Sequence, residues 1–112
     1  MSANRHRGEI SAVLDGKEYR LCLTLGALAE LETAFAADDL GALVERFSTG
    51  RLSASDLVRV IGAGLRGGGA DVSDSDVGAM RSDDGAAGYA RIVSELLAVT
   101  FGAPEPGAPE NP

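Results

Sequence analysis

A possible phosphate-binding pattern lies between Val58 and Gly67, where Gly62, Gly64 and Gly67 match the spacing GxGxxG. In a dinucleotide-binding domain such a run follows a strand, begins a helix and belongs to a βαβ unit. Here a helix-capping sequence precedes the run, its apolar residues have helical spacing, and a Gly-Gly-Ala-Asp loop follows. We therefore predict a glycine-containing helix that another helix can approach closely, and no nucleotide site.

A cluster of aspartate and serine between Asp71 and Asp76 has the composition of a calcium loop. An EF-hand loop also needs a glycine at its sixth position and a bidentate glutamate at its twelfth, and the sequence lacks both. Ser73 and Asp76 instead resemble a capping box, with aspartate in place of the usual glutamate or glutamine. We expect them to begin a helix, with no metal site.

The other reactive side chains lack partners. His6 lies in a polar N-terminal segment, where no fixed acid–base partner is expected, and Cys22 has no neighbouring histidine to activate its thiol. Glu30 and Glu32 lie about 200° apart around a helix, too far for a catalytic carboxylate pair. The sequence favours a protein that is not an enzyme and needs no cofactor.

Length and charge exclude further classes. The chain has 112 residues, 45% of them hydrophobic, which suits one small domain with its own core. With 17 acidic and 10 basic residues its net charge is −7, which argues against binding the phosphate backbone of nucleic acid. No apolar stretch approaches the roughly 18 to 20 residues that span a bilayer, so we expect no membrane partner.

The N-terminal part of the domain has the pattern of a β-hairpin. Residues 8–14 and 17–23 alternate apolar and polar side chains on either side of Asp15-Gly16, and both turn residues tolerate positive φ. A two-residue loop pairs Leu14 with Lys17, Ala12 with Tyr19 and Ile10 with Leu21. This register predicts one apolar face, formed by Ile10, Ala12, Leu14, Tyr19, Leu21 and Leu23.

After Thr24 the apolar spacing becomes helical. The first predicted helix runs from a Thr24 cap to about Ala36, and the second from Asp38 or Asp39 to a stop at Gly50. The third begins at a capping box formed by Ser53 and Asp56 and ends at Gly67, and the fourth runs from the Ser73 box through Val77 and Met80. The last runs from near Asp83 or Asp84 to Gly102. The predicted fold class is α+β, an N-terminal hairpin followed by four to five short helices in one small domain.

Three segments are expected along the chain. Residues 1–7 form a flexible polar arm and residues 8–102 the single α+β domain. Residues 103–112 contain all four prolines of the sequence and little apolar area, so they are expected to be a disordered tail.

One segment resembles a known family. The run Leu21-Cys-Leu-Thr-Leu-Gly-Ala-Leu-Ala-Glu-Leu-Glu32, preceded by the hairpin, is similar to the gene transfer agent family of tail assembly chaperones. The likeness continues through Asp39-Leu40, Arg46-Phe47 and Gly50-Arg51-Leu52-Ser53. It covers about Arg7 to Val77 and, more loosely, the last helix. Such proteins are encoded among the tail genes of tailed phages, and of prophage-derived gene transfer agents in alphaproteobacteria.

The resemblance implies a tail assembly chaperone in the bacterial cytoplasm. It would bind the tape measure protein, keep it soluble and assist tail tube subunits as they polymerise around it. A groove between small helices can accept an apolar helical seam of the kind a tape measure exposes.

Two alternatives stay open, and both are also non-enzymatic. One is a structural tail component that remains in the particle, and the other is a small adaptor or regulatory protein-binding module.

The predicted binding surface is apolar, because short helices do not bury every apolar residue they carry. It draws on Leu40, Val44, Val58, Val60, Val77 and Met80, part of which we expect to be exposed.

Overall fold

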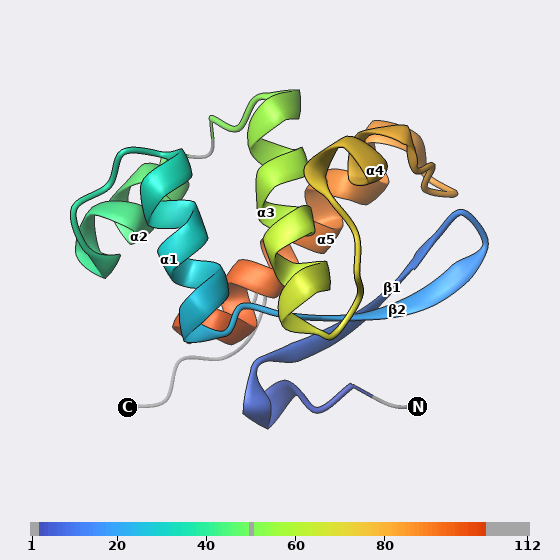
Figure 1. Cartoon of the computed structure of the whole chain (residues 1–112), viewed down its shortest axis with the longest axis horizontal. Helices are drawn as coiled ribbons and strands as arrows, with labels where there is room; N and C mark the ends of the chain where they lie inside the picture. The colour runs from blue at the N-terminus through green and yellow to red at the C-terminus, as the bar shows by residue number, and fades with distance from the viewer. Residues whose placement is uncertain (1–2, 50, 103–112) are drawn as a thin grey trace, which may run out of the picture.

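The computed structural model describes residues 3–49 and 51–102 (Figure 1). Within this range a short 3-10 turn, a two-stranded antiparallel sheet and five α-helices follow one another. The elements are η1 (Arg5–Arg7), β1 (Glu9–Leu14), β2 (Lys17–Cys22), α1 (Leu25–Ala34), α2 (Leu40–Ser48), α3 (Ala54–Gly67), α4 (Asp74–Ala79) and α5 (Gly85–Phe101). The predicted α+β class, a hairpin followed by helices, is confirmed.

The hairpin has the predicted turn and the predicted register. Asp15 and Gly16 have φ of 54° and 73°, as a tight turn with two left-handed residues requires. Leu14 pairs with Lys17, and the ladder continues without a bulge to the pair of Glu9 and Cys22. The apolar face of the hairpin is therefore turned toward the helices.

The helices begin at the predicted caps. The side chains of Thr24 and Asp39 accept hydrogen bonds from backbone N–H groups of the first turns of α1 and α2. Ser53 and Ser73 each form a complete capping box with the aspartate three residues later. The run with GxGxxG spacing is therefore helical, as predicted from its context.

The ends of two helices differ in detail from the prediction. α1 ends at Ala34 rather than about Ala36, because Ala36 has a left-handed φ of 53° that breaks the helix. α2 ends at Ser48, and the predicted stop at Gly50 lies outside the described residues. So do residues 1–2 of the predicted arm and the predicted tail 103–112.

The core lies between one face of the hairpin and the helices that cover it (Figure 1). α3 occupies the centre and contacts β2, α1, α4 and α5, while α5 also contacts β1, and α2 packs mainly against α1. The largest fully buried side chains are Leu14, Leu21, Leu31, Leu43, Val60, Ile61, Leu65, Val93 and Leu96.

Small residues let α3 lie against the hairpin. A Cβ atom added at Gly64 would lie 2.7 Å from a methyl carbon of Leu96 in α5. At the end of α3, Cβ atoms added at Gly67 and Gly68 would lie 2.0 Å from the carbonyl oxygens of Cys22 and Arg20. The predicted close approach is thus present, and it involves a strand as well as a helix.

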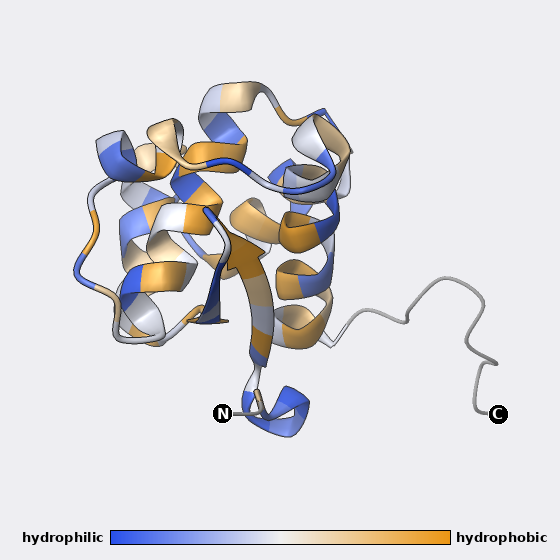
Figure 2. Cartoon of the chain, turned by 90° about the vertical axis from the view of Figure 1, so that its right-hand side faces the viewer, coloured by the Kyte–Doolittle hydropathy of each residue, from blue (hydrophilic) through white to orange (hydrophobic). Residues whose placement is uncertain are grey.

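The first residues form a short turn that the sequence pattern did not predict. Asn4 caps η1 through its side chain, and its N–H donates to the carboxylate of Glu9 at 3.0 Å. Glu9 is buried although it lies on the polar face of the hairpin, because η1 covers it. Figure 2 shows this hydrophilic turn at the edge of the domain, next to the N-terminus.

The contact of α3 with β2 predicts opposite effects of alanine at two helical glycines. Gly67→Ala should lower the free energy of unfolding by about 1–3 kcal/mol, because the new Cβ would overlap a backbone carbonyl that cannot rotate away. A Cβ atom added at Gly78 in α4 would meet nothing within 4 Å. Gly78→Ala should therefore raise the free energy of unfolding by about 0.5–1 kcal/mol, because alanine has the higher helix propensity. Urea unfolding followed by circular dichroism measures both, and equal shifts for the two variants would contradict the role of Gly67.

Candidate interaction surface

Large apolar side chains are exposed at four places in the described part of the chain. Leu25 at the start of α1 is 81% exposed, and Val13 of β1 is 45% exposed. Leu40 and Val44 are 41% and 40% exposed and lie four residues apart, so they share one side of α2. We call Leu40 and Val44 the α2 pair.

The adjoining residues of the same apolar stripe hold α2 on the domain. Leu43 and Phe47 are buried, and the ring of Phe47 meets that of Phe35 edge to face at a centroid distance of 5.4 Å. Such a pair adds about 0.5–1.5 kcal/mol to the energy of area burial. The α2 pair is therefore the uncovered edge of a stripe whose other members, Leu43 and Phe47, are buried.

A charged contact also connects α2 to α3. The guanidinium of Arg46 lies 5.4 Å from the ring centre of Phe35 and donates to the carboxylate of Asp56 at 3.2 Å. Asp56 is 6% exposed and accepts a second bond from the N–H of Ser53. Burial alone would raise the pKa of Asp56, but the hydrogen bonds from Ser53 and the charge of Arg46 outweigh it and lower that pKa.

A second guanidinium joins three segments on another side of α3. Arg66 donates to Glu30 of α1 at 2.6 Å, to Asp74 of α4 at 3.0 Å and to the carbonyl oxygen of Val72 at 3.1 Å. The hydrogen bond to Glu30, with that to Asp74, raises the pKa of Arg66 despite its partial burial. Asp74, which lies within the cluster from Asp71 to Asp76, is thus a partner of Arg66.

The six residues predicted for an apolar binding surface fall into three groups. Leu40 and Val44 are exposed, and Val58 and Met80 are half-buried. Val60 and Val77 are 0% and 4% exposed, because α3 is covered by neighbours on several sides and α4 packs against it. A partner of the folded domain does not reach Val60 and Val77, which corrects their place in the predicted surface.

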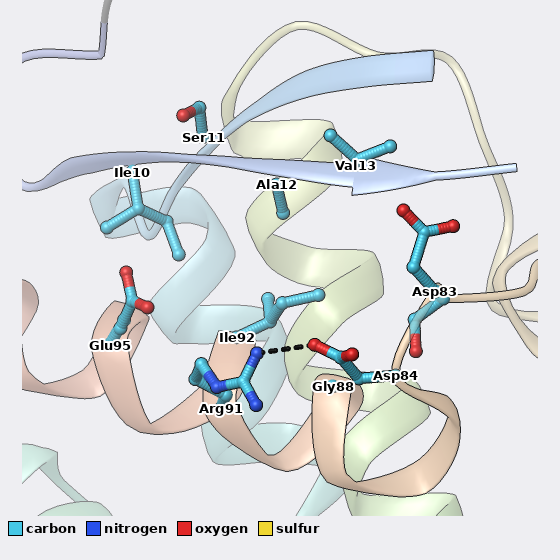
Figure 3. A pocket seen from close by; sticks show the side chains of 11 residues that line it. Ile10, Ser11, Ala12, Val13, Asp83, Asp84, Gly88, Arg91, Ile92 and Glu95 are labelled. Carbon is cyan, nitrogen blue, oxygen red and sulfur yellow. Dashed lines mark hydrogen bonds and ion pairs between the residues drawn. The ribbon is translucent and has the colours of Figure 1, made fainter. Parts of the chain in front are cut away.

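A groove lies between β1 and α5, and sequence reasoning did not predict it (Figure 3). Its volume is about 200 Å³. Ile10, Ala12 and Ile92 contribute its apolar lining, and Asp84 and Arg91 form a 2.7 Å ion pair at its rim. The sequence carried no local signal for it, because its two walls come from segments near opposite ends of the domain.

The remaining residues with reactive side chains lie apart from this groove. His6 is exposed in η1, and Cys22 is a half-buried free cysteine at the end of β2. Within residues 3–49 and 51–102, no group of three histidine, cysteine or acidic side chains lies close enough together to hold a metal ion. In the same part of the chain, no helix combines the length and apolar character needed to cross a bilayer.

Comparison with known proteins relates this sequence to a family of phage tail proteins. A family model described as "Phage tail tube protein, GTA-gp10" matches residues 7–103. The chain therefore belongs to this gene transfer agent and phage tail family, which supports a tail-related role. Neither the curated proteins nor the solved structures gave a match.

The Arg46–Asp56 contact predicts a pH-dependent contribution to stability. Because the pKa of Asp56 is lower in the folded protein than its ordinary value of 3.8, this contribution is complete well above pH 3.8. It is lost as the pH falls through the lower, folded-state pKa. Asp56→Asn should therefore reduce the free energy of unfolding by about 1–3 kcal/mol at neutral pH, and by less toward pH 3.

Asp76→Asn provides the matched control, since Asp76 completes the same type of capping box on the exposed helix α4 without an arginine partner. Its effect at neutral pH should be smaller. Urea titrations of both variants between about pH 7 and pH 3 measure the difference. Equal losses for Asp56→Asn and Asp76→Asn would show that Arg46 adds nothing to the capping box.

Proposed function

We propose that this protein is a non-enzymatic structural component of the tail of a phage-like particle or gene transfer agent. The observation that carries the proposal is the family match over residues 7–103, whose description names a tail tube protein. In this role the chain binds other tail proteins, including tail tube subunits, and is retained in the particle. Before the particle is released from the cell, the protein acts in the bacterial cytoplasm, where tail proteins assemble.

The surface of the domain supports a role in protein contacts. The α2 pair is apolar and partly exposed on a helix that Phe47 and Arg46 hold on the domain. Such an arrangement presents apolar area to a partner without weakening the core. A net charge of −7 keeps the free protein soluble by self-repulsion until it meets that partner.

A second candidate is the tail assembly chaperone that binds the tape measure protein and leaves before the particle is complete. The segment from Leu21 to Glu32, which resembles that family, favours it. This segment is the end of β2 and most of α1. A chaperone of this kind would use the same α2 pair, because a tape measure helix offers an apolar seam.

The amount of this protein in finished particles separates the two roles. Particles purified from a producing culture should contain the chain in a constant ratio to the major tail protein, as measured by quantitative mass spectrometry with labelled peptides. A chain that is abundant in the producing cells and missing from washed particles would contradict the structural role and favour the chaperone. Copurification with the tape measure protein from cells would then identify its partner.

Charge at the α2 pair should block assembly in either role. Leu40→Asp combined with Val44→Asp should reduce incorporation into particles, or tape measure binding, by at least about tenfold, because two carboxylates would be buried without partners. Leu25→Asp is the control, an apolar-to-acidic change at a more exposed position on α1. Circular dichroism checks that all variants stay folded, and unchanged incorporation of the double variant would exclude the α2 pair as the interface.

A further inference from the structure

The two strands of the hairpin have outer edges that differ in access. At the edge of β2, the end of α3 approaches so closely that Gly67 and Gly68 leave no room for a Cβ atom beside the carbonyl oxygens of Cys22 and Arg20. A further strand therefore has no place beside β2. The edge of β1 is the one that faces the groove.

The register identifies which backbone groups of β1 point outward. Leu14 and Lys17 flank the two-residue turn, so Ile10, Ala12 and Leu14 bond to β2. The N–H and C=O groups of Ser11 and Val13 consequently point away from β2. Among the described residues, no hydrogen bond partner is found for these outward groups.

Both ends of this open stretch are closed by the fold itself. The N–H of Glu9 donates to the carbonyl oxygen of Asn4 at 3.0 Å. At the other end, the N–H of Asp15 donates to the carbonyl oxygen of Arg81 at 2.8 Å, and the N–H of Arg81 donates back to the Asp15 carboxylate. The open edge is therefore a short window of backbone from Ser11 to Val13.

Nothing in this window protects it from pairing. Natural edge strands are blunted by proline, by bulges or by charged side chains. From Ser11 to Val13 the chain has none of these, and Val13 adds exposed apolar area. An edge of this kind is a template for an additional strand.

The groove beside the edge offers a site for the side chains of such a strand (Figure 3). Successive side chains of a strand alternate, so every second one would point toward α5. The middle of the groove has the apolar side chain of Ile92, while Asp83 lies near Val13 and Glu95 near Ile10. A matching strand has an apolar side chain at its centre and longer polar ones on either side.

The charge around the groove selects basic flanking residues. The carboxylate of Asp84 is paired with the guanidinium of Arg91, and a carboxylate oxygen of Glu95 lies 3.7 Å from a guanidinium nitrogen of the exposed Arg5. No ion pair joins Asp83 to another described residue, so carboxylates outnumber guanidiniums here. A second copy of this chain, with its own net charge of −7 and the same acidic rim, is repelled where a basic segment is attracted.

We propose that the open edge of β1, together with the groove between β1 and α5, binds an extended segment of a partner protein by strand addition. The segment has the pattern basic–x–apolar–x–basic on its groove-facing side. This inference goes beyond the proposed tail role and does not depend on whether the protein stays in the particle.

The first test uses the full chain and a labelled peptide of sequence Thr-Thr-Arg-Thr-Val-Thr-Arg-Thr-Thr in fluorescence anisotropy. We expect saturable binding that is lost when both arginines are replaced by glutamate. It should also weaken at least about tenfold when N–H groups along one edge of the peptide are methylated, since these pair with β1. No saturation up to about 1 mM, or equal binding of the methylated peptide, would overturn the proposal.

Variants of the protein test the two parts of the site separately. Ser11→Pro removes an outward N–H from an edge strand, where proline is tolerated, and should weaken binding at least about tenfold, whereas Ser11→Ala keeps the N–H and should bind normally. Asp83→Lys should weaken binding about three- to tenfold. Asp38→Lys changes the net charge equally at an exposed site in the turn between α1 and α2, and serves as its control.

Two outcomes would assign the edge differently. If the chain forms a dimer in sedimentation experiments and Ser11→Pro abolishes it, the occupant is a second copy and the basic-segment proposal fails. If Asp83→Lys and Asp38→Lys weaken binding equally, the attraction is general and the groove is not the site. Should Ser11→Pro fail to fold, the methylated peptide and the two charge variants still decide.

Discussion

The close contact between α3 and the hairpin is the constraint on which the rest of the domain depends. A two-stranded sheet is marginal by itself in water, so it needs a helix to cover its apolar face. α3 comes close enough because Gly64 leaves room for Leu21 of β2, and for Leu96 of α5, and Gly67 leaves room for the carbonyl oxygen of Cys22. Leu21, Leu65 and Leu96 are then fully buried in the space between these elements.

Arginine side chains complete what apolar packing does not supply. The domain has few aromatic residues, and several of its helices are short. Arg46 connects α2 to Asp56, and Arg66 connects α1 and α4 to α3. These partly buried pairs set the orientation of the peripheral helices, because a guanidinium donates in fixed directions. An acidic chain thereby uses its few basic residues at the joints between elements.

The same packing determines where the protein can meet its partners. By covering the edge of β2, the end of α3 leaves β1 as the accessible edge of the sheet. α2 buries Phe47 and Leu43 and leaves Leu40 and Val44, at the edge of the same apolar stripe, partly exposed. Membership of a phage tail family gives these surfaces a context, since tail proteins work through contacts with one another.

Local sequence was enough to predict the two strands and the α-helices of this fold, but not the short turn η1. The Asp15-Gly16 turn, the alternation around it and the serine–aspartate boxes act over a few residues, so their outcome does not depend on the rest of the chain. The helical context of the glycine run likewise excluded a nucleotide-binding turn. The family resemblance, carried by residues 21–32, pointed correctly to phage tail proteins.

Tertiary structure alone decided which of the predicted apolar residues reach the surface. Val60 and Val44 have the same side-chain chemistry, yet Val60 is surrounded by neighbours of the central helix whereas Val44 lies on the outer side of a peripheral one. The contact of Arg66 with Glu30 and the groove between β1 and α5 were equally invisible, because each brings together segments separated by tens of residues. Periodicity reports which face of an element is apolar, but only the packing of all elements determines how much of that face is covered.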